Sequence, residues 1–88
     1  MKKYRVEFTP DAFDDINKID KATAERILYK ITWLAVNYDF LVHESLKGKL
    51  NRFCKLRIGH WRVLYSVNHP KKIISIHLIG HRKDIYKS

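Results

Sequence analysis

The spacing of apolar residues changes along this chain, and the change limits the fold more than any other feature. Between about residues 12 and 37, apolar side chains recur every three or four positions, as on one side of an amphipathic helix. From residue 53 they alternate with polar side chains, as in a strand with one buried face. The chain has 88 residues, the size of one small domain. We therefore predict a single domain, residues 1–88, in which helices precede most of the sheet.

The first half predicts a strand and then two helices. Lys3–Phe8 alternates charged and apolar residues, which is typical of a strand. Thr9 and Pro10 should begin a helix, because Thr is a common N-cap and Pro suits the first helical position. A second helix should run from a cap at Asp20 to about Asn37. The apolar stripes of the two helices consist of Ala12, Phe13, Ile16 and Ile19, and of Ala24, Ile27, Leu28, Ile31, Leu34 and Ala35.

The second half predicts three strands. They are Phe53–Ile58, Trp61–Val67 and Ile73–Ile79. Gly59-His60 joins the first two as a two-residue hairpin turn, and residues 68–71 join the second pair. Residues 38–52 show no clean period and are predicted to form a loop. The fold class is α+β, with two layers in the order β-α-α-β-β-β and an N-terminal helical hairpin packed on an antiparallel sheet.

Alternation assigns the strand residues to two faces. The core face should hold Cys54, Leu56, Ile58, Val63, Tyr65, Val67, Ile74, Ile76 and Leu78. The uncovered face should hold Phe53, Lys55, Arg57, Arg62, Leu64, Ser66, Ser75 and His77. The hairpin turn would place Arg57 directly opposite Arg62, and opposed like charges are destabilising. We expect an anion between them; alternatively the side chains splay into water, or one pairs with Asp84 or Glu44.

The charge of the chain is concentrated in its second half. Residues 1–44 hold seven basic and eight acidic side chains, whereas residues 45–88 hold eleven and one. Such a half favours a polyanionic partner, because neutralised phosphates release counterions; an anionic membrane surface or an acidic protein segment would satisfy the same charge. No apolar stretch is long enough to span a membrane. A single cysteine, Cys54, excludes an internal disulfide, and we expect a cytoplasmic protein without metal or cofactor.

Three motifs follow one another along the second half: LKGKL at 46–50, KLRIGHWRVLY at 55–65 and IGHRKDIY at 79–86. Together they resemble the RelE family of type II toxin–antitoxin toxins, within the RelE/ParE superfamily. The resemblance spans nearly the whole chain and implies the same β-α-α-β-β-β order. It also implies an mRNA interferase that enters the ribosomal A site and cleaves mRNA. The attacking group would be the RNA's own 2′-hydroxyl, and the products a 2′,3′-cyclic phosphate and a 5′-hydroxyl.

The resemblance also assigns roles to residues of this chain. Lys55 matches the lysine that acts as general base, and Arg62 the arginine that holds the phosphate. Arg82 matches the arginine linked to protonation of the leaving group, and Tyr86 the tyrosine that orients the base. His81 is a rival general acid, and a second lysine common in the family is replaced by Phe53. Further RNA phosphate contacts are expected from Arg57, Lys47, Lys49, Arg52 and Lys83.

Other functions stay open at this point. A ParE-like toxin would inhibit DNA gyrase without any chemistry of its own, and a catalytically inactive RelE-like protein would only bind its partner. A toxin also implies a cognate antitoxin, whose acidic or amphipathic segment would cover the basic face. The expected partners are therefore an antitoxin, the ribosome and mRNA. Neither a membrane nor a small-molecule cofactor is expected.

Overall fold

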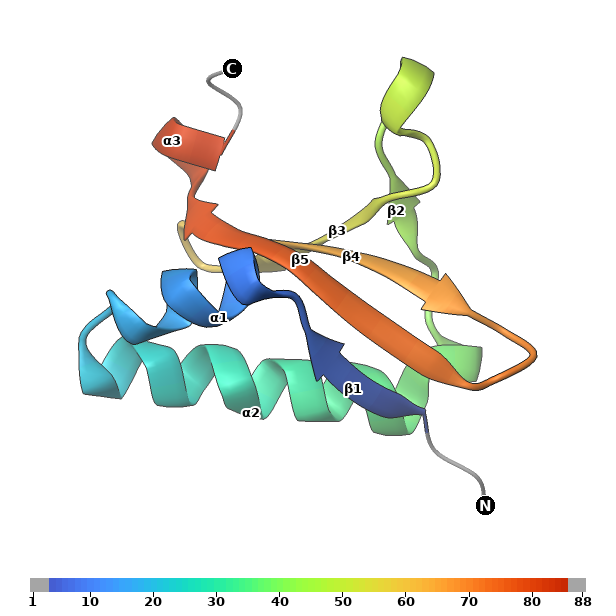
Figure 1. Cartoon of the computed structure of the whole chain (residues 1–88), viewed down its shortest axis with the longest axis horizontal. Helices are drawn as coiled ribbons and strands as arrows, with labels where there is room; N and C mark the ends of the chain where they lie inside the picture. The colour runs from blue at the N-terminus through green and yellow to red at the C-terminus, as the bar shows by residue number, and fades with distance from the viewer. Residues whose placement is uncertain (1–3, 86–88) are drawn as a thin grey trace.

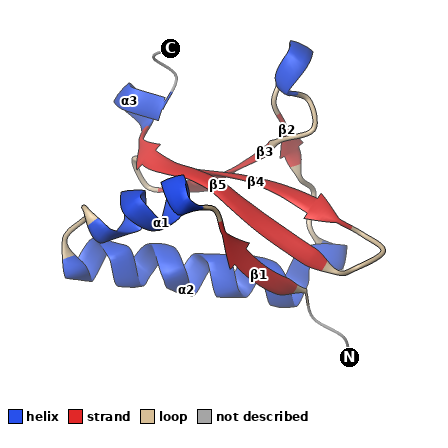
Figure 2. Cartoon of the chain, in the orientation of Figure 1, coloured by secondary structure: helices blue, strands red, loops and turns tan. Residues whose placement is uncertain are grey.

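The computed structural model describes residues 4–85 and has two layers (Figure 1). A five-stranded sheet forms one layer, and the two longer helices lie against one of its faces (Figure 2). The elements are β1 (Arg5–Phe8), α1 (Pro10–Asn17), α2 (Lys21–Asn37), a 3-10 turn (Tyr38–Phe40), β2 (Glu44–Ser45), a second 3-10 turn (Gly48–Leu50), β3 (Cys54–Ile58), β4 (Trp61–Asn68), β5 (Ile73–His81) and α3 (Arg82–Ile85). The predicted α+β class, with a helical hairpin packed on a sheet, is confirmed.

Both long helices begin where the sequence predicts. The Thr9 hydroxyl accepts a hydrogen bond from the Ala12 N–H at 3.2 Å, and Pro10 is the first helical residue. Asp20 accepts in the same way from the Thr23 N–H at 3.0 Å. These side chains satisfy N–H groups that have no partner within the helix. The short break at residues 18–20, between the end of α1 and the start of α2, lets the two helices fold back on each other.

The strands lie in the order β1-β5-β4-β3-β2. The β2–β3, β3–β4 and β4–β5 pairs are antiparallel, but β1 runs parallel to β5. The prediction of an entirely antiparallel sheet is therefore wrong for β1. A parallel pair needs a long crossover connection, and here α1, α2 and the strands that follow them provide it.

A bulge in β5 moves one apolar residue to the other face of the sheet. Relative to β4, the strand contains one extra residue, His77, after which simple alternation no longer holds. The prediction that Leu78 faces the core is therefore wrong. Leu78 lies opposite Leu64, away from the helices, and Ile79 is buried in its place at 4% exposure.

The core lies between the helices and the sheet. Its buried residues are Tyr4, Ala12, Ile16, Ile27, Ile31, Leu34, Ala35, Tyr38, Ile58, Val63, Tyr65, Ile74, Ile76 and Ile79. Two residues predicted on the helical stripes, Phe13 and Leu28, are instead largely exposed. Each directly follows a buried residue, Ala12 or Ile27. A turn of about 100° per residue therefore takes its side chain away from the sheet.

Helix α1 covers the part of β5 that β1 is too short to reach. The Thr9 N–H donates to the Ile76 carbonyl at 3.0 Å, and the Thr9 hydroxyl to the His77 carbonyl at 3.4 Å. Further along, the Asp15 carboxylate accepts from the Ile79 N–H at 3.0 Å. Unpaired groups on an edge strand invite association with other chains, and these contacts satisfy them.

Several short elements lie where the sequence predicts no regular structure. Within the predicted loop 38–52 are two 3-10 turns and β2, which pairs Glu44 with Lys55 and Ser45 with Cys54. The four residues of α3 extend the chain beyond β5. Elements of two to four residues are too short to show a hydrophobic period. Of these, β2 matters most, because it reaches the face that carries the basic residues.

The bulge can be tested by two substitutions in neighbouring positions. Ile79→Ala should lower the free energy of unfolding by about 2–5 kcal/mol, because it removes buried methyl groups and leaves a cavity. Leu78→Ala removes a side chain of similar size from the partly exposed face and should cost less than about 1.5 kcal/mol. Urea denaturation of both variants measures the difference. A larger loss for Leu78→Ala would contradict the observed register.

Candidate functional site

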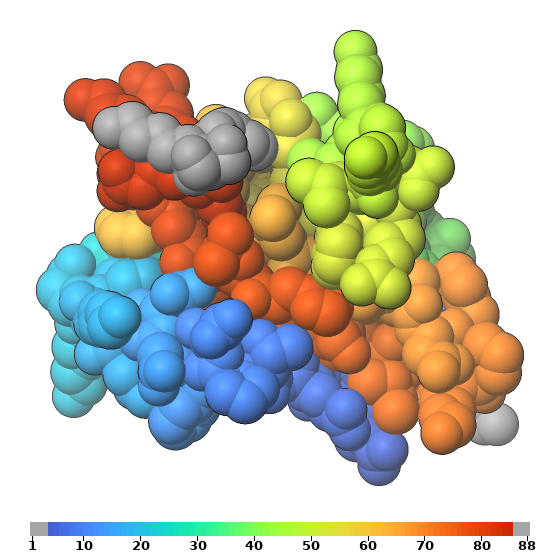
Figure 3. Space-filling model, turned by 45° about the horizontal axis from the view of Figure 1, so that its top comes forward, coloured from blue at the N-terminus to red at the C-terminus, as the bar shows by residue number. Residues whose placement is uncertain are grey.

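The β3–β4 hairpin places three basic side chains on the face of the sheet away from the helices, here called the outer face. Arg57 lies opposite Arg62, and Ile58 opposite Trp61, as the two-residue turn predicts. Lys55 shares this face, because alternate residues of a strand point to the same side. Figure 1 shows α1 and α2 beneath the sheet, and Figure 3 tilts the outer face toward the viewer.

Glu44 lies between two of these cations. Its Oε2 atom is 3.2 Å from Lys55 Nζ and 3.2 Å from Arg57 Nη2. The hydrogen bond from Lys55 and the positive charges of both neighbours lower the pKa of the Glu44 carboxyl group, against a smaller effect of burial. Lys55 therefore has an anionic neighbour as well as cationic ones. The negative charge of Glu44 offsets the repulsion from Arg57 and Arg62 that the sequence suggests.

The two opposed arginines turn away from each other. Arg57 pairs with Glu44, which is one of the alternatives that the sequence left open. Arg62 folds over the hairpin turn, where Nη1 donates to the carbonyl oxygens of Gly59 and Trp61, each at 2.9 Å. A guanidinium group has five N–H donors, and these bonds use only those of Nη1. Arg62 therefore keeps donors for a ligand on the outer face.

The sequence contains a signal for Glu44 as a site residue that the prediction did not use. Between Asp39 and Asp84 it is the only acidic residue. In a stretch so rich in lysine and arginine, one carboxylate is the only local counter-ion that those side chains can share. From the sequence, Glu44 is one possible partner of an arginine, but it is not among the predicted site residues.

The last residues of β5 and helix α3 lie at the turn end of the hairpin. The Arg82 N–H donates to the His60 carbonyl at 2.7 Å, which ties α3 to the β3–β4 turn, and Arg82 is exposed. His81 lies opposite Trp61 in the β4–β5 ladder, with 5.6 Å between the ring centroids. This pairing puts the His81 ring on the helix side of the sheet, away from Lys55.

Two further predicted residues belong to the C-terminal segment. Lys83 is exposed on α3, and its N–H donates to His81 Nδ1 at 3.2 Å. Tyr86 lies outside the described residues. The structure therefore places Lys55, Arg57 and Arg62 on one face of the sheet, with Arg57 and Arg62 turned away from each other and Arg82 at the turn end of the hairpin. The catalytic roles assigned to them stay predictions.

The chain between β2 and β3 forms a second basic border of the outer face. In Figure 1 its 3-10 turn and α3 rise from the sheet at opposite ends. The predicted phosphate-binding residues of this segment are all exposed: Lys47, Lys49 and Arg52. Arg52 lies over the Phe53 ring at 4.8 Å, and that ring contacts His77 at 4.9 Å. Burial, followed by the charge of Arg52, lowers the pKa of His77, so this histidine is neutral at pH 7.

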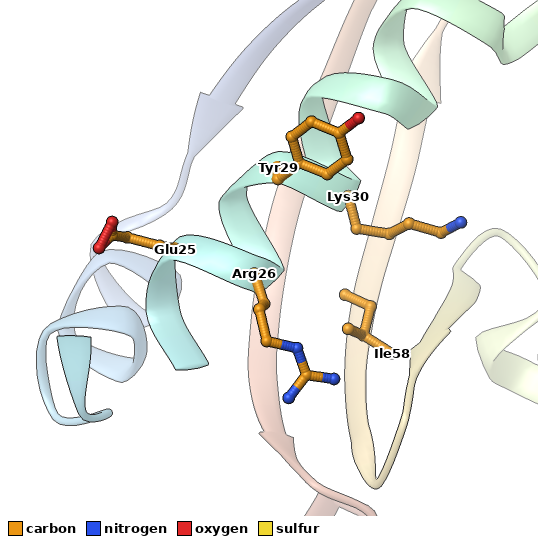
Figure 4. Close-up of a pocket in the computed structure, with 5 residues that line it drawn as sticks. All are labelled: Glu25, Arg26, Tyr29, Lys30 and Ile58. Atoms are coloured by element: carbon orange, nitrogen blue, oxygen red, sulfur yellow. The ribbon is translucent and has the colours of Figure 1, made fainter. Parts of the chain in front are cut away.

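Two hollows lie between β3 and α2. The larger has a volume of about 370 Å³ and is lined by Glu25, Arg26, Tyr29, Lys30 and Ile58. Figure 4 shows Arg26 and Lys30 reaching from α2 toward Ile58. The second, of about 290 Å³, shares Lys30 and extends past apolar side chains to Glu44 and Arg57. A groove with an apolar floor and cations along its sides therefore leads to the outer face.

Residues 4–85 contain no group of three or more His, Cys, Asp or Glu side chains that could hold a metal ion. Within the same range, no helix has both the length and the apolar character needed to cross a bilayer. Cys54 is a free thiol, partly buried in β3.

The chain has relatives among families and solved structures. A family model described as the ParE toxin of the type II toxin–antitoxin system, parDE, matches residues 6–86. One chain of the RelBE2 toxin–antitoxin complex of Mycobacterium tuberculosis is 27% identical to this chain and has a TM-score of 0.70. The match covers 96% of this chain and 97% of that chain. The RelE–RelB complex of Pyrococcus horikoshii is 25% identical, with coverage of 94% and 99% and a TM-score of 0.72.

The fold extends to more distant structures. The isolated RelE toxin of Escherichia coli has a TM-score of 0.74 at 18% identity and covers 89% of this chain and 83% of its own. No curated protein sequence matches. The resemblance to RelE toxins is thus confirmed at the level of the superfamily, by a model that spans nearly all of the chain and by structures of the same size. This chain belongs to the ParE toxin family of type II toxin–antitoxin systems, within the RelE/ParE superfamily.

Proposed function

We propose that this toxin is a ribosome-dependent endoribonuclease that cleaves mRNA in the A site and so inhibits translation. The observation that supports this most is the row formed by Lys55, Arg57 and Arg62 on the face of the sheet that α1 and α2 leave uncovered (Figure 1). Cleavage of RNA passes through a dianionic phosphorane, and fixed cations aimed at that charge are an effective means of catalysis. The RelBE2 complex, which matches this chain almost end to end, is a toxin–antitoxin complex.

The proposed reaction needs only groups that the chain and the RNA supply. The 2′-oxygen forms a bond to phosphorus while the bond from phosphorus to the 5′-oxygen breaks. Lys55, as the neutral amine, takes the proton of the 2′-hydroxyl, and Arg62 holds the phosphate oxygens through the guanidinium donors left free by its bonds to the turn. Arg82, at the end of the same face, donates a hydrogen bond to the leaving 5′-oxygen, and the proton taken by Lys55 reaches that oxygen through water. The products are a 2′,3′-cyclic phosphate and a 5′-hydroxyl.

We also propose that a cognate antitoxin segment lies in the groove between α2 and β3. The groove combines an apolar floor with Arg26, Lys30 and Arg57 at its sides, which suits a segment of alternating acidic and apolar residues. Because the groove ends at Glu44, such a segment would also reach the basic face.

Inhibition of DNA gyrase is the second candidate function. It is favoured by the family model, which describes a ParE toxin. A toxin of that kind binds its target and needs no groups aimed at one phosphate. The row of cations on the hairpin therefore favours RNA cleavage.

Arg62→Ala should lower the rate of mRNA cleavage by about 100-fold or more, because it removes the cation that stabilises the phosphorane. Primer extension on mRNA translated in vitro measures the cut sites. The matched control is Lys71→Ala, which removes an exposed cation from the β4–β5 turn and should leave cleavage unchanged. If translated mRNA stays intact with the wild-type toxin while DNA supercoiling fails, the gyrase function is the correct one.

RNA binding by the isolated toxin should weaken steeply with salt. A single-stranded RNA with a 2′-deoxy substitution at the scissile position resists cleavage and serves as the probe. Lys49→Ala should reduce the slope of log affinity against log salt by about 0.7, because one phosphate contact is lost. Lys18→Ala, an exposed lysine at the end of α1, is the control. A slope that changes equally in both variants would show that RNA does not bind on the predicted face.

A further inference from the structure

Strand β2 carries Glu44 but is too short to hold it in place alone. Its two residues pair with Cys54 and Lys55, and 3-10 turns and irregular chain lie on either side. Glu44 is itself half-exposed, with 50% of its side-chain surface accessible. A carboxylate at the surface gains little from an ion pair and loses side-chain entropy by forming one. The ion pairs alone would therefore hold Glu44 only weakly.

The neighbouring residue, His43, is held at both ring nitrogens. Nδ1 lies 2.6 Å from the Tyr65 hydroxyl, and Nε2 lies 2.8 Å from the Tyr38 carbonyl oxygen. The imidazole also stacks on the Tyr38 ring, with 3.9 Å between centroids and 26° between planes. Tyr38 and Tyr65 both belong to the buried core, at 7% and 2% exposure. His43 thus joins the β2 segment to the rigid part of the protein.

The partners of His43 determine which nitrogen carries the proton. A carbonyl oxygen can only accept a hydrogen bond, so Nε2 must be the donor to Tyr38. In the neutral ring Nδ1 then accepts the bond from the Tyr65 hydroxyl. Burial raises the pKa of Tyr65, so this hydroxyl keeps the proton that it donates. The contact with the Tyr38 carbonyl therefore places a proton on Nε2 of His43.

His43 directly precedes β2 and contacts the core residues Tyr38 and Tyr65, whereas Glu44 contacts the cations of the outer face. We propose that His43 is a positioning residue: its ring anchors β2 to Tyr38 and Tyr65 and thereby holds the Glu44 carboxylate between Lys55 and Arg57. That this arrangement matters for RNA rests on the proposed function. The positioning of Glu44 by His43 does not depend on that function, because every contact lies within the free protein.

The position of Glu44 Oε2 also marks where a ligand oxygen can meet two cations at once. Lys55 is only 19% exposed and Arg57 58% exposed, and each lies 3.2 Å from this one atom. A phosphate oxygen that replaces Oε2 would contact both heads without moving either strand. His43 therefore sets the separation of Lys55 and Arg57 before RNA binds, which lowers the cost of organising the site.

An NMR titration of the Glu44 side-chain carboxyl carbon tests the proposal. In the wild-type toxin the pKa of Glu44 should lie below that of an exposed glutamate, because Lys55 and Arg57 stabilise the carboxylate. His43→Ala should raise the pKa of Glu44 at least as far as Arg57→Ala does, since the carboxylate is no longer held between the cations. Ring ¹⁵N shifts of His43 should show the proton on Nε2.

Two more variants keep the test decisive if His43→Ala does not fold. Tyr65→Phe removes only the hydroxyl that donates to Nδ1, and should raise the pKa of Glu44 in the same direction by a smaller amount. His69→Ala is the control: His69 contacts the edge of the same Tyr38 ring, at 5.9 Å, but lies exposed on the β4–β5 turn, and its loss should leave Glu44 unchanged.

The proposal is overturned if the pKa of Glu44 stays at its wild-type value in folded Tyr65→Phe and His43→Ala proteins, or if the His43 proton lies on Nδ1. The same variants then separate the two proposals. If translated mRNA is cut, His43→Ala should slow cutting by about 10- to 100-fold, as expected for a misplaced catalytic group. If no mRNA is cut by the wild type but the pKa of Glu44 responds, only the nuclease function fails.

Discussion

The register between β3 and β4 decides which side chains of this chain can act together. The Gly59-His60 turn sets that register, and Gly59 adopts a φ of 59°, where a side chain would be strained. A slip of one residue would turn Lys55 and Arg57 into the core and bring Leu56 to the surface. The cost of burying those charges is far greater than any gain on the outer face, so the apolar alternation and the glycine turn enforce the same pairing. The basic row is thus a consequence of how the core is built.

The same register places like charges opposite each other, and other groups of the chain pair with these charges. Glu44 lies between Lys55 and Arg57, and backbone carbonyl groups of the turn accept from Arg62. These partners are exposed or partly exposed, and surface ion pairs contribute only about 0–1 kcal/mol. A ligand that brings its own anionic oxygens can therefore replace them at little cost. The free protein keeps its cations organised while leaving them open to exchange.

Much of this fold can be predicted from the local sequence, and so can part of the candidate site. Periodicity predicts the helices, the hairpin turn and the face that holds Lys55, Arg57 and Arg62. It does not predict the bulge at His77, because Leu78 and Ile79 are both apolar and either could face the core. Nor does it predict the parallel pairing of β1 or the two-residue strand that carries Glu44, which depend on contacts between distant segments. Residues placed by long periodic elements are predictable, whereas those placed by one tertiary hydrogen bond are not.

The difference between core residues and outer-face residues limits what membership of the family shows about function. The core residues are shared requirements of the fold, so a match over residues 6–86 shows the scaffold and the toxin class. The outer-face side chains contact little of the core, and they can change without altering the scaffold. A toxin that only binds its target needs a complementary surface, with no demand that two cations meet at one point. Lys55 and Arg57 do meet at one oxygen, 3.2 Å from each. A phosphate oxygen at that point would meet both side chains, and the proposed RNA cleavage rests on such contacts between cations and the phosphate.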